Sequence, residues 1–241
     1  MPLTRKSFIA STALAASAAV IAKGGRAEAA ATMAAGTGRA PVHFHVMNKS
    51  EYDYAWMMGV MNSGTAHKQV FESVNPLVIA PGVASVYIHM QNALNAYEFS
   101  YGMGSGSLAT LAVFIGPSVV LAFDNKMWQK YHFGSAFNLD STNTYYSAGS
   151  NLTLGGSPDD PNGIYQDWSA EAVLKRGGSF MVCHNATTAV AGVFASKMGL
   201  KPSDVLAEWS NNMLPGFKFV PAGVAAVQLA QENGWKLYTI I

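Results

Sequence analysis

Charged side chains and cysteine are scarce in this sequence. Asp, Glu, Lys and Arg make up 12% of the 241 residues, against about 25% in a typical soluble domain. The formal net charge is +1, and no cluster of Lys and Arg is interleaved with aromatic residues, so we expect no nucleic-acid partner. The single cysteine excludes an internal disulfide framework and a zinc site built from several cysteines.

Long hydrophobic runs are also missing from most of the chain. After residue 40, no stretch approaches the roughly 18 consecutive apolar residues of a transmembrane helix, so we expect no stable membrane anchor. What the chain does have is apolar and aromatic surface: half of its residues are hydrophobic, including 12 Phe, 10 Tyr and 5 Trp. That is enough apolar surface for the core of one folded domain.

The first 31 residues have the pattern of an export signal. Residues 4–9 (TRKSFI) resemble a twin-arginine consensus in which Lys6 replaces the second arginine. A short, mildly apolar stretch rich in Ala and Ser follows, then two basic residues, and residues 27–31 offer small-residue cleavage sites. We therefore predict that residues 1–31 are a twin-arginine-type signal peptide and that the mature protein is periplasmic.

The remainder alternates between strand-like and helix-like segments, which favours a parallel sheet with helices on both faces. We predict a single α/β domain over residues 40–241, with three layers and a mostly parallel five-stranded sheet. The predicted strands are residues 41–47, 108–115, 179–183, 217–220 and 235–241. The predicted longer helices are residues 50–62, 83–101, 119–131, 167–175, 187–198 and 222–233. Residues 134–166 carry no period and are predicted to be a long loop.

Cys183 is the strongest candidate for a reactive group. It ends the predicted strand 179–183, and ligands of open α/β sheets bind outside the carboxyl ends of the strands. The helix that follows begins with unpaired N–H groups and a partial positive charge, which favour a thiolate. The alternative is a small buried residue at the end of a core strand, because free cysteine is among the most buried residue types.

The last third of the chain resembles the DsrE/DsrF-like family of small α/β proteins related to sulfur relay. The pattern Cys183-x-Asn185 at a strand end, followed by Val-Pro-Ala-Gly-Val at 220–224, is its most specific part. The segments that carry the resemblance are residues 91–94, 114–119, 180–185, 214–216, 220–225 and 229–235. Relative to typical members of the family, residues 49–81 and 134–166 are insertions.

This resemblance implies a DsrE-like, flavodoxin-like arrangement of layers and a sulfane-sulfur-carrying role for Cys183. It also implies that the protein forms a homo-oligomer. The partner that it implies is a small sulfur compound or a sulfur-relay protein. The candidate ligand-binding residues around the thiol are Asn185, His184, His45, Asn48, Asn92 and Gly116.

Two histidines mark the first predicted strand. His43 and His45 are two residues apart and would share one face of it, with His45 and Asn48 near its carboxyl end. One interpretation is that the two histidines are ligands of a metal such as copper. The favoured interpretation is that both lie in or beside the sheet with their hydrogen bonds satisfied. We predict neither a bound metal nor a cofactor.

Two functions remain open from the sequence. In the first, the exported protein binds or carries sulfane sulfur on Cys183. In the second, it is a non-catalytic periplasmic ligand-binding or assembly protein in which Cys183 is structural. An accessible thiol in a cleft would favour the first function, and a thiol covered by residues 49–81 or 134–166 would favour the second.

Overall fold

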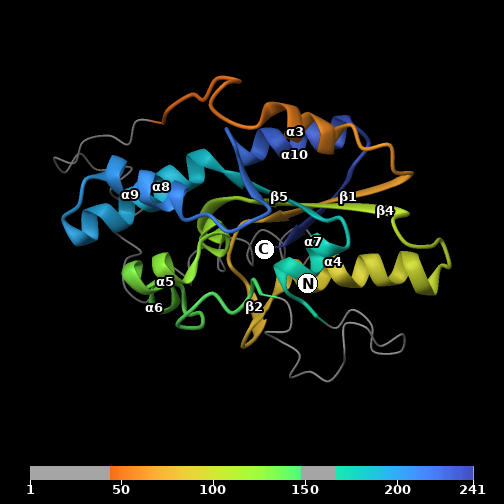
Figure 1. Ribbon diagram of the computed structural model, residues 1–241, viewed down its shortest axis with the longest axis horizontal. Helices are drawn as coiled ribbons and strands as arrows, with labels where there is room; N and C mark the ends of the chain where they lie inside the picture. Colours follow the sequence, from red (N-terminus) through yellow and green to blue (C-terminus); the bar gives the residue numbers. More distant parts are fainter. Residues whose placement is uncertain (1–43, 148–166, 241) are drawn as a thin grey trace, which may run out of the picture. The chain divides into compact units, whose positions relative to one another are not determined.

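A five-stranded parallel sheet forms the centre of the structure. The computed structural model (Figure 1) describes residues 44–147 and 167–240. In that part of the chain the strands lie in the order β6-β5-β4-β1-β7. Every neighbouring pair in this sheet runs parallel. The strands are β1 (His67–Ser73), β4 (Leu108–Phe114), β5 (Ser179–Cys183), β6 (Phe217–Val220) and β7 (Lys236–Ile240). The predicted α/β class is confirmed.

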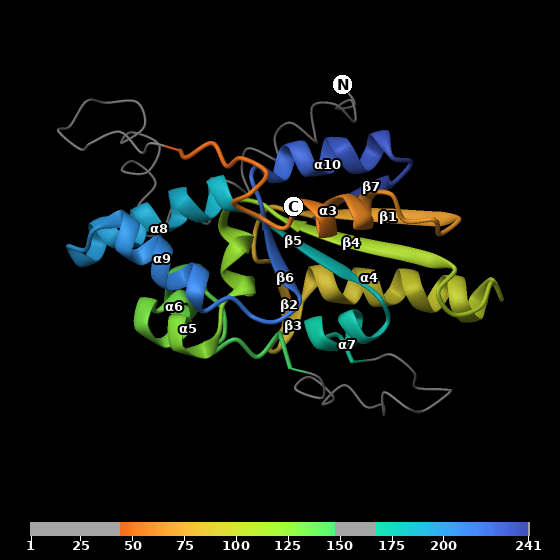
Figure 2. The same ribbon diagram turned by 45° about the horizontal axis from the view of Figure 1, so that its top comes forward.

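Helices cover both faces of the sheet, which completes three layers. Helices α3 (Tyr54–Met61) and α10 (Gly223–Glu232) lie on one face, and α4 (Ser85–Asn95) and α7 (Ala170–Lys175) lie on the other (Figure 2). Successive strand residues alternate between the two resulting cores. Leu111 and Val113 of β4, for example, pack with α3 and α10, whereas the intervening Ala112 packs with α4. Because helices cover both faces of the sheet, the side chains on both sides of β4 are buried, which explains its continuous apolar sequence.

The other elements surround this centre. A two-stranded antiparallel sheet precedes α4, a turn of π-helix extends that helix, and a 3-10 helix follows β4. These elements are β2 (Val78–Ala80), β3 (Val83–Ala84), η1 (Ala96–Ser100), η2 (Gly116–Ala122), α5 (Asn125–Tyr131), α6 (Phe133–Phe137), α8 (His184–Met198) and α9 (Pro202–Asn211). The predicted helix at 119–131 is therefore two elements. They part at the extended residue Phe123, after which Asp124 caps α5 by accepting a hydrogen bond from the Met127 N–H.

The predicted first strand at 41–47 is wrong. Residues 44–47 form no strand, and residues 41–43 lie outside the described part of the chain. The first strand of the sheet is β1, which falls inside residues 49–81, the segment that the sequence marked as an insertion. The sequence of β1 is HKQVFES, and only Val70 and Phe71 form an apolar pair in it. Such a short apolar run gives no recognisable strand period.

Several sequence predictions fall on residues that the structure does not describe. The signal peptide at 1–31 is one, and most of the predicted loop at 134–166 is another, because residues 148–166 are not described. The beginning of that loop contains helix α6. Within residues 44–147 and 167–240, no helix is long and apolar enough to span a bilayer.

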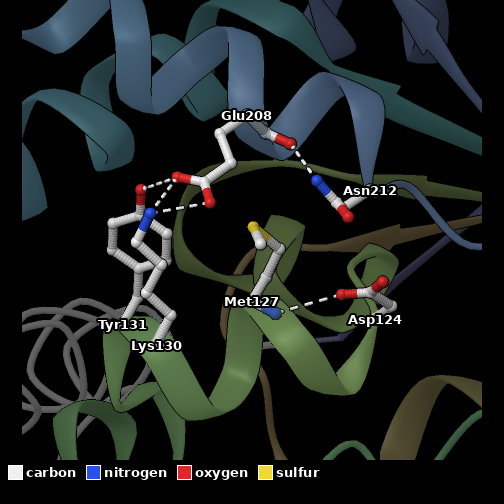
Figure 3. A network of polar contacts seen from close by, with 6 residues as sticks. All are labelled: Asp124, Met127, Lys130, Tyr131, Glu208 and Asn212. Atoms are coloured by element: carbon white, nitrogen blue, oxygen red, sulfur yellow. Dashed lines mark hydrogen bonds and ion pairs between the residues drawn. The ribbon is translucent and has the colours of Figure 1, made fainter.

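A charged group joins α5 to α9 (Figure 3). The Glu208 carboxylate accepts hydrogen bonds from Lys130 Nζ, 2.7 Å from each oxygen, and from the Tyr131 hydroxyl at 2.5 Å. The Asn212 side chain donates to the backbone oxygen of Glu208 at 2.7 Å. Burial by itself would raise the pKa of Glu208, but the bonds from Lys130 and Tyr131 outweigh burial and leave that pKa below its ordinary value of 4.5.

The substitution Glu208→Gln tests this link through its pH dependence. The folded-state pKa of Glu208 lies below its unfolded value, so the ionised group stabilises the fold above about pH 4.5, and this stabilisation is lost as the pH falls. Urea unfolding at about pH 7 should show a loss of about 1 kcal/mol in the variant. The difference should shrink as the pH falls below about 4.5. A loss that keeps the same size as the pH falls would contradict the electrostatic explanation.

Candidate functional site

Cys183 lies at the point where the chain leaves the sheet toward opposite faces. It ends β5 and is paired in register with Val220, the last residue of β6. The helix after β5, α8, packs into the core on the α4 face, whereas the helix after β6, α10, packs into the core on the α3 face. In open α/β sheets, ligands bind in the crevice outside the carboxyl ends of strands where the connections diverge in this way.

The Cys183 thiol caps helix α8. Its sulfur accepts a hydrogen bond from the Ala186 N–H at 3.3 Å, and the Thr187 hydroxyl donates to the Cys183 carbonyl oxygen at 2.9 Å. The position of Cys183 at a strand end beside a helix N-terminus agrees with the sequence interpretation. Cys183 as a whole is 5% exposed, so in this conformation only a small part of the residue reaches solvent.

The N-terminus of α10 packs directly against Cys183. A methyl group added at Gly223 would lie 3.1 Å from Cys183 Cβ and 2.6 Å from Ile115 Cγ1, which is closer than packed carbon atoms approach. Glycine at position 223 therefore lets the N-terminus of α10 pack against Cys183 Cβ. The Asn185 N–H donates to the Pro221 carbonyl oxygen at 3.3 Å and joins the start of α8 to the end of β6.

His184, His45 and Glu51 form an ionisable group beside the start of α8. His45 Nε2 lies 2.5 Å from a Glu51 carboxylate oxygen, and the other oxygen accepts from the Asn48 N–H at 2.8 Å. The half-buried ring of His184 packs edge-on against Phe219, and its Nδ1 is buried without a hydrogen-bond partner in the structure. Burial lowers the pKa of His184, a charge on His45 lowers it further, and Glu51 acts in the opposite direction.

Glu51 was missed by the sequence analysis, although a signal for it was present. Asn48 and Glu51 are three residues apart, which is the spacing at which a carboxylate reaches back to a backbone N–H in a capping box. The side chain of Asn48 bonds within the same turn, accepting from Ser50 N–H and Oγ at 3.1 and 2.5 Å. Asn48 thus shapes the segment that carries His45.

The remaining predicted residues separate into two places. Gly116 follows β4 at the carboxyl edge. Its φ of +62° favours glycine, and a methyl group added there would lie 3.1 Å from the Val74 carbonyl oxygen. Asn92 is exposed on α4, two turns after Ser85, about 10 Å along the helix axis from its start. That helix runs away from the carboxyl edge (Figure 1), so Asn92 is not brought to the group around Cys183.

A metal centre finds no support in the described residues. No three side chains among their His, Cys, Asp and Glu residues are placed to hold one ion. His43, the second member of the sequence-suggested histidine pair, lies outside the described part of the chain.

Comparisons of the chain with protein-family models, with curated proteins and with solved structures give no match. The DsrE-like resemblance therefore stays a prediction.

Substitutions of His45 and of Glu51 should change the pKa of His184 in opposite directions. Replacing His45 by Gln removes a positive charge and should raise the pKa of His184, whereas replacing Glu51 by Gln removes a negative charge and should lower it. Titration of the imidazole signals by NMR measures both. His89 on α4, whose pKa is lowered by burial alone, is the internal control and should not move. Changes of the same sign in both variants would refute this account of the group.

Proposed function

We propose that this protein takes up sulfane sulfur on Cys183 as an exported, DsrE-like sulfur-binding protein. The observation that carries the proposal is the placement of Cys183 at the carboxyl edge of a parallel sheet: its sulfur accepts the Ala186 N–H at the N-terminus of α8, and its Cβ packs against the first residue of α10. Ligands of such sheets bind at this edge, and oriented N–H groups stabilise a sulfur anion there.

The chemistry at this position needs no further oxidant. The Cys183 thiolate attacks a sulfane sulfur of an inorganic polysulfide and forms a new S–S bond. The attacked S–S bond breaks, and its electron pair leaves with a polysulfide that is one sulfur atom shorter. The product is a persulfide anion on Cys183, which the N-terminus of α8 stabilises in the same way as the thiolate.

A second candidate function is favoured by the burial of the thiol. Cys183 is 5% exposed, caps α8 and lies under Gly223, all of which suit a structural residue in a ligand-binding or assembly protein. Sulfur uptake requires that a small sulfur donor reach the Cys183 sulfur, either through the small exposed part of the residue or through local movement of the residues that cover it. The two functions thus differ in whether the folded protein reacts.

The cellular setting belongs to the same proposal. We propose export by the twin-arginine route to the periplasm, on the pattern of residues 1–31. A lone thiol has no second cysteine in its own chain to form a disulfide with, so a bound persulfide would be passed to another molecule or protein. We further propose a homo-oligomer, for which the family resemblance is the support.

Intact-mass spectrometry of the mature protein after incubation with polysulfide tests sulfur uptake. We expect an adduct of one sulfur atom that a reducing agent removes. The Cys183→Ser variant should gain none, and because serine is a good N-cap it should keep α8 folded. Thermal unfolding of both proteins checks the fold. An adduct that forms only in denaturant would contradict sulfur uptake and support a structural thiol.

A further inference from the structure

A hollow that is open to solvent, called the cavity below, lies at the opposite edge of the sheet from Cys183. Its volume is about 310 Å³, and it is bounded by α3, by the first residues of β4 and β5, and by Trp235 just before β7. Ser179 begins β5 and Cys183 ends it, so the cavity and the thiol are separated by about 13 Å along that strand. The cavity is independent of the proposed sulfur site.

One face of α3 forms the roof of this cavity. Trp56, Gly59 and Val60 line it, and Gly59 and Val60 lie three and four residues after Trp56, which places all three on one side of the helix; Ser63, just after the end of α3, also lines it. A methyl group at Gly59 would meet nothing within 4 Å. The glycine therefore opens the space that a larger residue on this face would fill.

The floor of the cavity is made of small residues. Ala109 of β4 and Ser179 of β5 are on the sheet face that α3 covers. The next residues on that same face are larger: Leu111 on β4 and Met181 on β5. Gly177, just before β5, also leaves open space where a methyl group would be. The hollow is thus a local absence of side-chain volume at the start of two strands.

The two indole rings that bound the cavity are held in place. The Lys218 ammonium lies 4.9 Å from the centre of the Trp56 ring and is paired with Asp53 at 2.5 Å. Asp53 also caps α3 by accepting from the Trp56 N–H. Trp235 is nearly buried, and its Nε1 donates to the Met61 carbonyl oxygen at 3.0 Å. Fixed aromatic walls reduce the ordering that a bound ligand would otherwise require.

Helix α3 carries more apolar surface than the fold uses. Its sequence, YAWMMGVM, has no charged residue on any side, yet only Met57 and Met61 are buried. A helix on the surface of a domain normally has a polar outer face. The partly exposed ring of Trp56 and the side chain of Val60 therefore offer apolar contact beside the cavity.

We propose that this cavity binds a small, neutral, aromatic molecule. None of the described residues that line it is charged, which disfavours an ionic ligand, and Ser63 and Ser179 supply hydroxyl groups at its edge. Indole rings pack best with another flat ring, edge-on or offset. The volume is at the lower end of the range for ligand pockets, which limits the ligand to one ring or a fused pair.

NMR of the tryptophan indole N–H signals tests this proposal with benzamide as the neutral probe, and with benzoate and benzylammonium as charged probes of the same size. We expect benzamide to shift the Trp56 signal in a saturable manner in the full chain. The signals of Trp128 and Trp209, which are buried in the core on the other face, should stay in place. Both charged probes should bind at least about tenfold more weakly, since no described lining residue is charged and the Lys218 ammonium beside Trp56 is already paired with Asp53.

Two substitutions at one position provide the matched control. Gly59→Leu should fill the space and abolish the shift, while Gly59→Ala, whose methyl group meets nothing, should keep binding within a few-fold. Trp56→Leu should lower the affinity at least tenfold when it is read from the Trp235 signal. Thermal unfolding confirms that each variant is folded. Absence of a saturable shift, persistence of the shift in Gly59→Leu, or equal binding of the charged probes would each overturn the proposal.

Discussion

The close approach of Gly223 to Cys183 and Ile115 is the contact on which the arrangement of the carboxyl edge depends. Because residue 223 has no side chain, α10 can begin directly above the ends of β4 and β5. The chain then leaves β5 toward one face through α8 and leaves β6 toward the other through α10. The same contact places the first residue of α10 against Cys183 Cβ, and Cys183 is only 5% exposed. The Gly223 contact thus contributes to the burial of a residue that the cap on α8 positions.

The two edges of the sheet carry different chemistry. The carboxyl edge gathers ionisable groups, with His45, Glu51 and His184 beside the thiol. The amino edge has the cavity under α3, whose described lining is uncharged and bounded by Trp56 and Trp235. Small residues at the starts of β4 and β5 make this hollow, whereas larger residues fill the same face farther along the strands. A ligand at one edge would not compete with a ligand at the other.

The parts of the fold that could be predicted are those with strong local patterns. Strand β4 and strand β5, which ends at Cys183, could be predicted because burial on both faces leaves a continuous apolar sequence. Strand β1 was missed because its amino-terminal half is polar and only Val70 and Phe71 mark it. For the site, the strand end identified Cys183 and its neighbours, but the pairing of His45 with Glu51 depends on a turn that no hydrophobic period reveals. Asn92 was grouped with them by resemblance alone, and the direction of α4 separates it from them.

The central claim is that Cys183 reacts while the protein is folded. Its most direct test is the rate of Cys183 alkylation by iodoacetamide in increasing concentrations of urea, compared with the unfolding curve under the same conditions. Reaction through the native state or a small local opening gives a rate that hardly changes at low urea, and this is the predicted result. A rate that rises from the first addition of urea with the full slope of global unfolding would show that the thiol reacts only in the unfolded chain, and would contradict the claim.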